Sequence, residues 1–397
     1  MATDTYWQLE HEYYTIATDH DLIVRVIEHK EVTRTEGKGK DAKIVKDFVP
    51  NKVHEFKVKR SVVVDSSKYF DKLLDTNSSF KDSQQSRIDL LEDEARSAEI
   101  WFKILHGSDS GSSNLDITIK NVWEMLLTAH KYGLDPQLPA AKAWFEAWWL
   151  ANEKKPNGRT FDFGDYRELL FPCHTFDYAP GFAAATKHLA YNAIGHITEK
   201  RPDNFHHYHL RLELGIVQQI NAAKGRLKGI LFRGLYKPIK DSFTGPHCDC
   251  KFKTYYTYEQ ALFKTGAWPL EDTFLYNSIT KLLRMLGNFM LGNFRSKAVG
   301  PEMCAKCRFD VHKVVPEALS ETSDSFDGLC LDCMNTSNPK VGDADEEYWR
   351  HAEQGTAWDA HCRVRHSQPS WYFSFMGHKE KMIEWKKRPR NRNDSGS

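Results

Sequence analysis

The sequence predicts an α+β fold in two parts: a small mixed sheet capped by helices, followed by a mainly helical module that is rich in cysteine. Three observations support this prediction. Short β-branched segments alternate with amphipathic helical segments over the first 150 residues. Longer helical periodicity follows them. The first 172 residues contain no cysteine, whereas seven of the eight cysteines lie between residues 248 and 362.

The chain begins with strands and a helix pair. A β-branched segment at 21–27 predicts a strand, and a second strand is expected at 54–58. Between them, the polar and glycine-containing stretch 34–46 is interpreted as a long solvated hairpin loop. From residue 61, two short helices should meet at Ser66 and Ser67, because a serine hydroxyl can cap the second helix.

The next elements alternate between strand and helix. A short strand is expected at 88–90 and an amphipathic helix at 92–105. The alternation of apolar and polar residues over 115–119 indicates another half-buried strand. Helices should then cover 122–132, which ends before a glycine, and 138–149, which is rich in tryptophan.

The ordered set of these blocks resembles the BTB/POZ domain over about residues 18–150. That resemblance implies a domain without catalysis of its own, which homodimerises and presents surfaces to protein partners. The departures are a charged insertion at 34–48 and a Gly/Ser insertion at 107–114, both in expected loops. The blocks that carry the resemblance are Glu55–Arg60, Val63, Ser67, Tyr69, Phe70, Leu73, Leu74, Ile88–Leu90, Trp101–Leu105 and Leu126–Leu134.

One short motif in this region suggests a specific partner. Family members that recruit cullin ubiquitin-ligase scaffolds carry an apolar-x-Glu motif, and Phe80 and Asp82 stand at the matching place. An apolar anchor would fill a pocket, and the acid would meet a basic partner. Asp82 is one methylene shorter than glutamate. The alternative is an ordinary polar loop before the strand at 88–90.

The rear half contains several helical segments, at 166–171, 181–194, 210–235 and 274–290. The third becomes basic toward its end. Its cations could contact phosphates, or they could form a solvated face that suits the helix dipole. These cations are Lys224, Arg226, Lys228, Arg233 and Lys237.

Paired cysteines in the last third predict zinc. Cys304 and Cys307 form one C-x-x-C pair and Cys330 and Cys333 another, and two such pairs favour a closed, tetrahedral four-thiolate site. Twenty-two residues separate the pairs, enough for a hairpin or short helix. We expect the ion to be structural, because no catalytic zinc motif is present.

The remaining ligands could form a second zinc site, with His247 or His361 as substitutes and with interleaving of the pairs left open. Disulfides, buried thiols and redox C-x-x-C chemistry are the alternatives. Together with the front domain, this region resembles BTB proteins of the filamentous-fungal type. The ligands of this second set are Cys248, Cys250, Cys362 and His366.

Composition and the terminal sequences argue against several classes of function. The 397 residues carry a formal net charge of +1, which argues against a globally basic nucleic-acid coat. The sequence lacks a long apolar run, a secretory leader pattern, a G-x-S-x-G motif and a phosphate-binding glycine loop. An intracellular protein of the nucleus, the cytoplasm or both is expected. Five cations in residues 386–392 resemble an import signal, although a solubilising tail fits equally well.

We therefore predict a BTB/POZ domain at 18–150, a helical extension at 151–240, a zinc module at 241–378 and a basic tail at 379–397. The predicted function is a non-enzymatic interaction adaptor, with a cullin ligase scaffold among its partners and no membrane contact. The alternative is a nuclear regulator whose rear half and tail contact nucleic acid.

Overall fold

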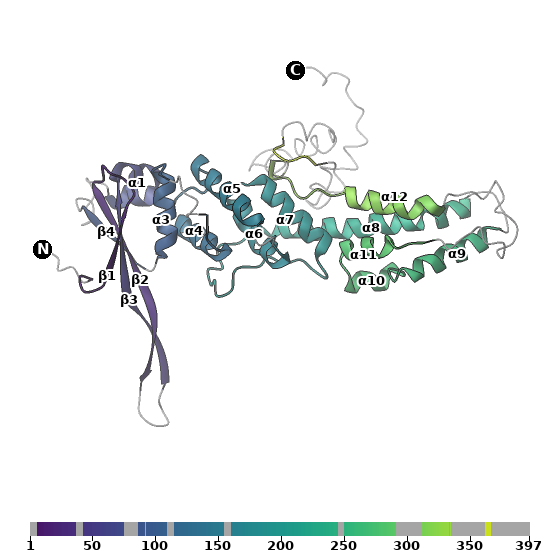
Figure 1. The fold of residues 1–397 in the computed structure, drawn as a ribbon, viewed down its shortest axis with the longest axis horizontal. Helices are drawn as coiled ribbons and strands as arrows, with labels where there is room; N and C mark the ends of the chain where they lie inside the picture. Colours follow the sequence, from purple (N-terminus) through teal and green to yellow (C-terminus); the bar gives the residue numbers. More distant parts are fainter. Residues whose placement is uncertain are drawn as a thin grey trace, which may run out of the picture. The chain divides into compact units, whose positions relative to one another are not determined.

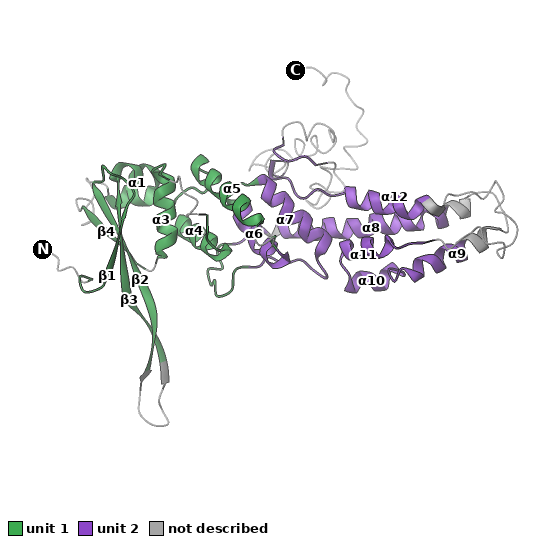
Figure 2. Ribbon diagram, viewed as in Figure 1, with its two compact units in different colours: residues 1–161, 175–178, 201–210 green, residues 162–174, 179–200, 211–397 purple. Residues whose placement is uncertain are grey.

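The chain folds into two compact units, as the computed structural model shows (Figures 1 and 2). The structure describes residues 6–36, 43–74, 86–91, 93–108, 115–154, 160–244, 250–290, 311–332, 334 and 362–366. Unit 1 comprises residues 1–161, 175–178 and 201–210. Unit 2 comprises residues 162–174, 179–200 and 211–397.

Four strands and twelve helices are found in the described residues. In chain order they are β1 (Glu10–Thr15), β2 (Leu22–Glu36), β3 (Lys43–Val58), α1 (Arg60–Ser66), α2 (Lys68–Leu74), β4 (Arg87–Leu91), α3 (Ala95–Leu105), α4 (Ile119–Tyr132), α5 (Pro139–Glu153), α6 (Phe163–Thr175), α7 (Ala179–Asn192), α8 (Leu214–Thr244), α9 (Cys250–Lys264), α10 (Leu270–Tyr276), α11 (Ile279–Leu286) and α12 (Val311–Asp324).

Unit 1 is built on a mixed four-stranded sheet with the order β1-β3-β2-β4. β2 and β3 are antiparallel, whereas β1 pairs with β3 and β4 pairs with β2 in parallel. Val24, Val26 and Phe56 are fully buried, as expected of β-branched and aromatic residues on a covered sheet. Arg25 is also buried, and its guanidinium donates to both carboxylate oxygens of Asp89 on β4 at 2.7 and 2.8 Å.

Specific side-chain hydrogen bonds fix the helices of unit 1. The predicted helix pair is confirmed: the Ser67 hydroxyl accepts the backbone N–H groups of Tyr69 and Phe70, which caps α2. The indole of Trp101 in α3 donates to the Met125 carbonyl of α4 at 2.8 Å. The Ser67 hydroxyl and the Trp101 indole, both buried, thus have hydrogen-bond partners in neighbouring elements.

The expected strand at 115–119 is wrong, because Thr118 starts a helix there. The Thr118 hydroxyl accepts the Asn121 N–H, and the Asn121 side chain accepts the Thr118 N–H at 3.1 Å. This reciprocal cap makes Ile119 the first residue of α4. The predicted end of the helix is confirmed, since Gly133 takes the left-handed conformation with φ at 63°.

The expected hairpin loop at 34–46 is also shorter than predicted. β2 continues to Glu36 and β3 begins at Lys43, so the polar residues form a paired ribbon. Cross-strand ion pairs join Arg34 to Asp47 at 2.6 Å and Lys46 to Glu31 at 2.7 Å. The mixed charge of residues 34–36 and 43–46 therefore belongs to a solvated two-stranded ribbon.

Unit 2 is mainly helical, and α8, α9, α11 and α12 contribute to its core. Leu231 and Leu235 of α8 pack with Tyr258 and Leu262 of α9 and with Val315 of α12. The predicted single helix at 274–290 is wrong: α10 ends at Tyr276, and Ser278 caps α11 by accepting the Lys281 N–H. Among the described helices, none is both long and apolar enough to cross a membrane.

Candidate functional site

One group of potential metal ligands lies in unit 2, formed by Cys330, Cys362 and His366. One ligand atom from each residue lies within 4.8 Å of the other two. Cys330 is fully buried, His366 is 4% exposed, and the His366 Nε2 atom lies 3.4 Å from the Cys362 sulfur. Two thiolates and one imidazole supply three ligands of a tetrahedral zinc site. This group can therefore hold a metal ion.

The chain that carries Cys330 is anchored on α7. After α12 ends, the Leu329 N–H donates to the Thr186 hydroxyl at 2.8 Å, and Thr186 donates to the Phe182 carbonyl at 2.8 Å. The Tyr191 hydroxyl donates to the Thr322 carbonyl at 2.8 Å, and burial raises its pKa above the ordinary tyrosine range. These hydrogen bonds hold the segment 322–329 against α7 and thereby fix the position of Cys330.

Gly328 allows this segment to approach α7 closely. Its φ angle is +102°, which residues with a side chain rarely adopt. A Cβ atom at this position would overlap the backbone of Ala183 in α7. A glycine two residues before Cys330 is therefore required for the observed position of that cysteine.

A second anchor brings Cys362 and His366 to Cys330. The Asp332 carboxylate accepts the Arg363 backbone N–H at 2.8 Å and the Arg363 Nε–H at 2.9 Å. The Arg363 Nη2 atom lies 2.8 Å from the same carboxylate. Asp332 follows Cys330 by two positions, and Arg363 follows Cys362 directly. This ion pair therefore holds the two ligand-bearing segments together.

The structure places only part of the predicted ligand set. It brings Cys330 of one C-x-x-C pair together with Cys362 and His366 of the other set, so the two sets mix. Cys250 begins α9, but its side chain lies outside the described residues. Outside them as well are Cys248, Cys304, Cys307 and Cys333, together with the partner-binding candidates Phe80 and Asp82 and the basic tail.

The cations at the basic end of α8 fall into two groups: some are engaged with neighbouring carbonyl groups and others are exposed. Lys224 is 5% exposed and donates to the Gly195 carbonyl, and burial lowers its pKa to about 8. Lys228 donates to the Phe274 carbonyl at 3.1 Å, and burial lowers its pKa as well. Arg226, Arg233 and Lys237 remain exposed. The surface that could meet phosphates is thus smaller than the sequence suggested.

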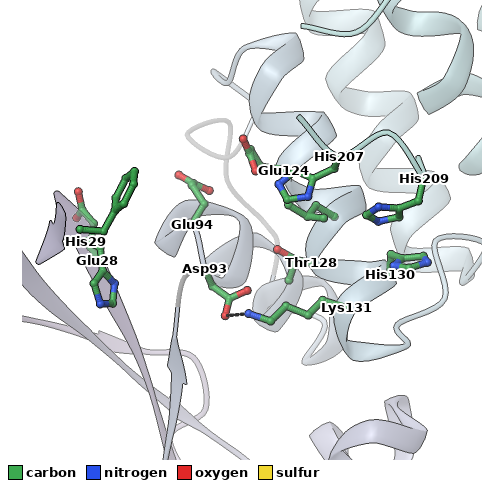
Figure 3. Close-up of a pocket in the computed structure, with 12 residues that line it drawn as sticks. Glu28, His29, Asp93, Glu94, Glu124, Thr128, His130, Lys131, His207 and His209 are labelled. Atoms are coloured by element: carbon green, nitrogen blue, oxygen red, sulfur yellow. Dashed lines mark hydrogen bonds and ion pairs between the residues drawn. The ribbon is translucent and has the colours of Figure 1, made fainter. Parts of the chain in front are cut away.

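Unit 1 contains a cavity of about 1020 Å³ beside α4 (Figure 3). Asp93 lies in its wall, where it accepts the Lys131 ammonium at 2.8 Å and the Tyr132 hydroxyl. Burial raises the pKa of the Glu124 carboxyl on α4. Three histidines, His130, His207 and His209, also line the cavity. The signal in the sequence that could have revealed this cluster is the occurrence of three histidines within residues 206–209.

Comparison with known proteins identifies the front of the chain. The model of the BTB/POZ domain family matches residues 34–142. The matched region runs from the β2–β3 ribbon through α1–α4 to the start of α5, within the unit that holds the mixed sheet. No curated protein matches the chain, and no solved structure does. Residues 34–142 are therefore a BTB/POZ domain.

Proposed function

We propose that this protein is a non-enzymatic adaptor: its BTB/POZ domain holds one protein partner, and unit 2 binds a client. The match of residues 34–142 carries the proposal, because a BTB/POZ domain implies a role in protein–protein interaction and is typically without catalysis. We further propose that two copies of the chain associate through this domain. An adaptor needs rigid surfaces rather than reactive groups, and both units offer buried cores that supply such rigidity.

The more specific proposal is that the partner is a cullin-type ubiquitin-ligase scaffold. It rests on the sequence pattern at Phe80 and Asp82, where an apolar anchor and an acid stand two residues apart before β4. Apolar anchors that fill a pocket dominate the affinity of most interfaces, so Phe80 should matter more than its polar neighbours.

The test is the affinity of the purified full-length protein for a purified cullin scaffold, measured by calorimetry. Phe80→Ala should weaken binding at least about tenfold, and Asp82→Ala less, because a rim charge contributes less than a buried anchor. Asp82→Glu should bind at least as tightly as the natural chain. The matched control is Tyr13→Ala, which removes an aromatic side chain that is 66% exposed on β1. If the natural chain does not bind, the cullin proposal fails while the adaptor proposal stands.

For unit 2 we propose a structural zinc ion at Cys330, Cys362 and His366, with a fourth ligand among the neighbouring cysteines of the sequence. The anchoring of Cys330 on α7 and the Asp332–Arg363 ion pair support this assignment, because zinc sites need ligands whose orientation is fixed by surrounding contacts. Such an ion would hold the client-binding module in one conformation.

A second candidate function is nucleic-acid binding in the nucleus. The exposed cations Arg226, Arg233 and Lys237 on α8 favour it, because they recur at steps of seven and four residues and so lie near one helix face. Binding of duplex DNA to the full-length chain should then weaken steeply between 50 and 200 mM salt. A change of Arg233 to Gln should reduce that salt dependence. Weak binding of DNA at both salt concentrations would contradict the nucleic-acid function and leave the adaptor as the proposed function.

A further inference from the structure

Three histidines gather on one wall of the cavity in unit 1. His130 comes from the last turn of α4, whereas His207 and His209 come from the segment 201–210 (Figure 3). The His130 and His209 ring centroids are 4.6 Å apart, and the His207 and His209 centroids are 5.9 Å apart. His209 therefore lies between the other two. All three side chains are exposed to solvent at the cavity.

We propose that His130, His207 and His209 bind a divalent transition-metal ion. Two imidazoles on one tetrahedral ion, each with a metal–nitrogen distance of about 2 Å, place their ring centroids about 5 Å apart. The two observed separations bracket that value. Among the described residues, none hydrogen-bonds to these three rings, so their nitrogens are available to an ion.

The three rings must turn to complete the site. Only the Cys330 group has three ligand atoms within 4.8 Å in the described part of the chain, so the histidines converge on an ion by rotation of their exposed side chains. This rotation needs no movement of a buried group. The His130–His209 pair, with the shorter centroid separation, binds first, and His207 supplies the third nitrogen.

The backbone of segment 201–210 is held against α4 within unit 1, which limits the entropy lost on binding. Phe205 is 6% exposed and packs edge-on against Trp123 of α4 at 5.3 Å between ring centroids. Leu210 is buried, and the Arg201 guanidinium donates to the Leu210 carbonyl at 3.1 Å. The histidines thus project from a fixed backbone, and only their side chains lose freedom.

The lining defines the class of the ion. Imidazole nitrogens favour zinc, nickel and copper over magnesium and calcium, which prefer oxygen ligands. Among the carboxylates of the cavity, Asp93 is already engaged by Lys131 and Tyr132. Glu124 on α4 lines the same cavity and can provide an oxygen ligand or neutralise the bound ion.

The experiment is a calorimetric titration of the purified full-length protein with Zn²⁺ alone. The natural chain should bind one zinc equivalent more than the double variant His130→Gln, His209→Gln. The single variant His207→Gln should bind that equivalent at least tenfold more weakly. Titration with Co²⁺ distinguishes this site from the cysteine site, because nitrogen ligands give d–d bands without the thiolate-to-metal charge-transfer band.

The matched control is His206→Gln, which removes a neighbouring histidine that does not line the cavity. It should bind the same number of zinc equivalents as the natural chain. Equal stoichiometry and affinity in the natural chain and in the double variant would overturn the proposal. A loss of the extra equivalent in His206→Gln as well would show non-specific surface binding and would overturn it too. Circular dichroism of each variant verifies that the chain is folded.

Discussion

At the residue scale, Lys224 is the clearest case of a charge that the fold disfavours. The side chain is 5% exposed, and its ammonium is satisfied by the Gly195 carbonyl rather than by a carboxylate. Burial is the main cause that lowers its pKa from 10.5 to about 8, and the nearby charge of Lys228 contributes second. At neutral pH the folded chain therefore retains a buried charge at a cost.

The pH dependence of stability follows from the direction of this shift. Between about pH 8 and 10.5 the unfolded chain keeps the Lys224 proton and the folded chain loses it, so the cost of the buried charge falls and the free energy of unfolding rises with pH. Lys224→Met should raise the free energy of unfolding of unit 2 by on the order of 2 kcal/mol at pH 7, and the gain should shrink by pH 10. Denaturant unfolding at both pH values measures this. Lys237→Met, an exposed lysine on the same helix, should show no such trend, and an equal gain at both pH values would contradict the assignment.

At the element scale, the contact of α8 with α12 depends on Gly234. A Cβ atom at Gly234 would lie 2.6 Å from the Ala318 Cβ atom, closer than two carbons can approach. Gly234→Ala should destabilise unit 2 by about 2 kcal/mol, because an overpacked interface forces the helices apart. Adding Ala318→Gly should recover part of the loss. Thermal unfolding of the three chains measures both effects.

Gly229 on the same helix provides the control. A Cβ atom there would meet no atom within 4 Å. Gly229→Ala should therefore stabilise the helix by up to about 1 kcal/mol, the usual difference in helix propensity. If Gly234→Ala stabilised unit 2 as Gly229→Ala does, the close approach of α8 and α12 would be wrong.

The elements also show how far sequence reasoning reaches. Periodicity predicted the helices around 122–132 and 210–235, and serine predicted the cap of α2. The errors arose where a local cap overrides a pattern. Residues 115–119 alternate like a strand, yet the Thr118–Asn121 hydrogen bonds begin a helix within them. The apolar face at 274–290 is continuous, yet Ser278 divides it into two helices. Caps depend on side-chain geometry, which periodicity does not contain.

At the scale of the whole molecule, paired cysteines indicated the region of the candidate metal site but not its members. The C-x-x-C spacing predicted Cys330 as a metal ligand. The grouping with Cys362 and His366 depends on the Asp332–Arg363 ion pair, which joins residues 31 positions apart. Contacts between distant segments, such as Leu329 with Thr186, carry no local signature. The cluster of histidines in the unit 1 cavity could not be predicted for the same reason, since His130 is far from His207 in the sequence.

Removal of the metal should affect unit 2 and leave unit 1 unchanged. Without an ion, two thiolates and an imidazole converge with no counter-charge, so the position of Cys330 then depends on the contacts of its segment with α7 alone. Removing the metal with a chelator at pH 7 should raise amide hydrogen exchange at residues 322–332 and 362–366 at least about tenfold, as measured by mass spectrometry. Exchange in β2 and β3 of unit 1 should stay unchanged, because their protection comes from sheet pairing.

Cys330→Ser should abolish the bound zinc in metal analysis, whereas Cys173→Ala, at a fully buried cysteine in α6, should retain it. A zinc-free chain with unaltered exchange at 322–332 would show that packing on α7 alone holds this segment, and the structural role of the ion would then be lost.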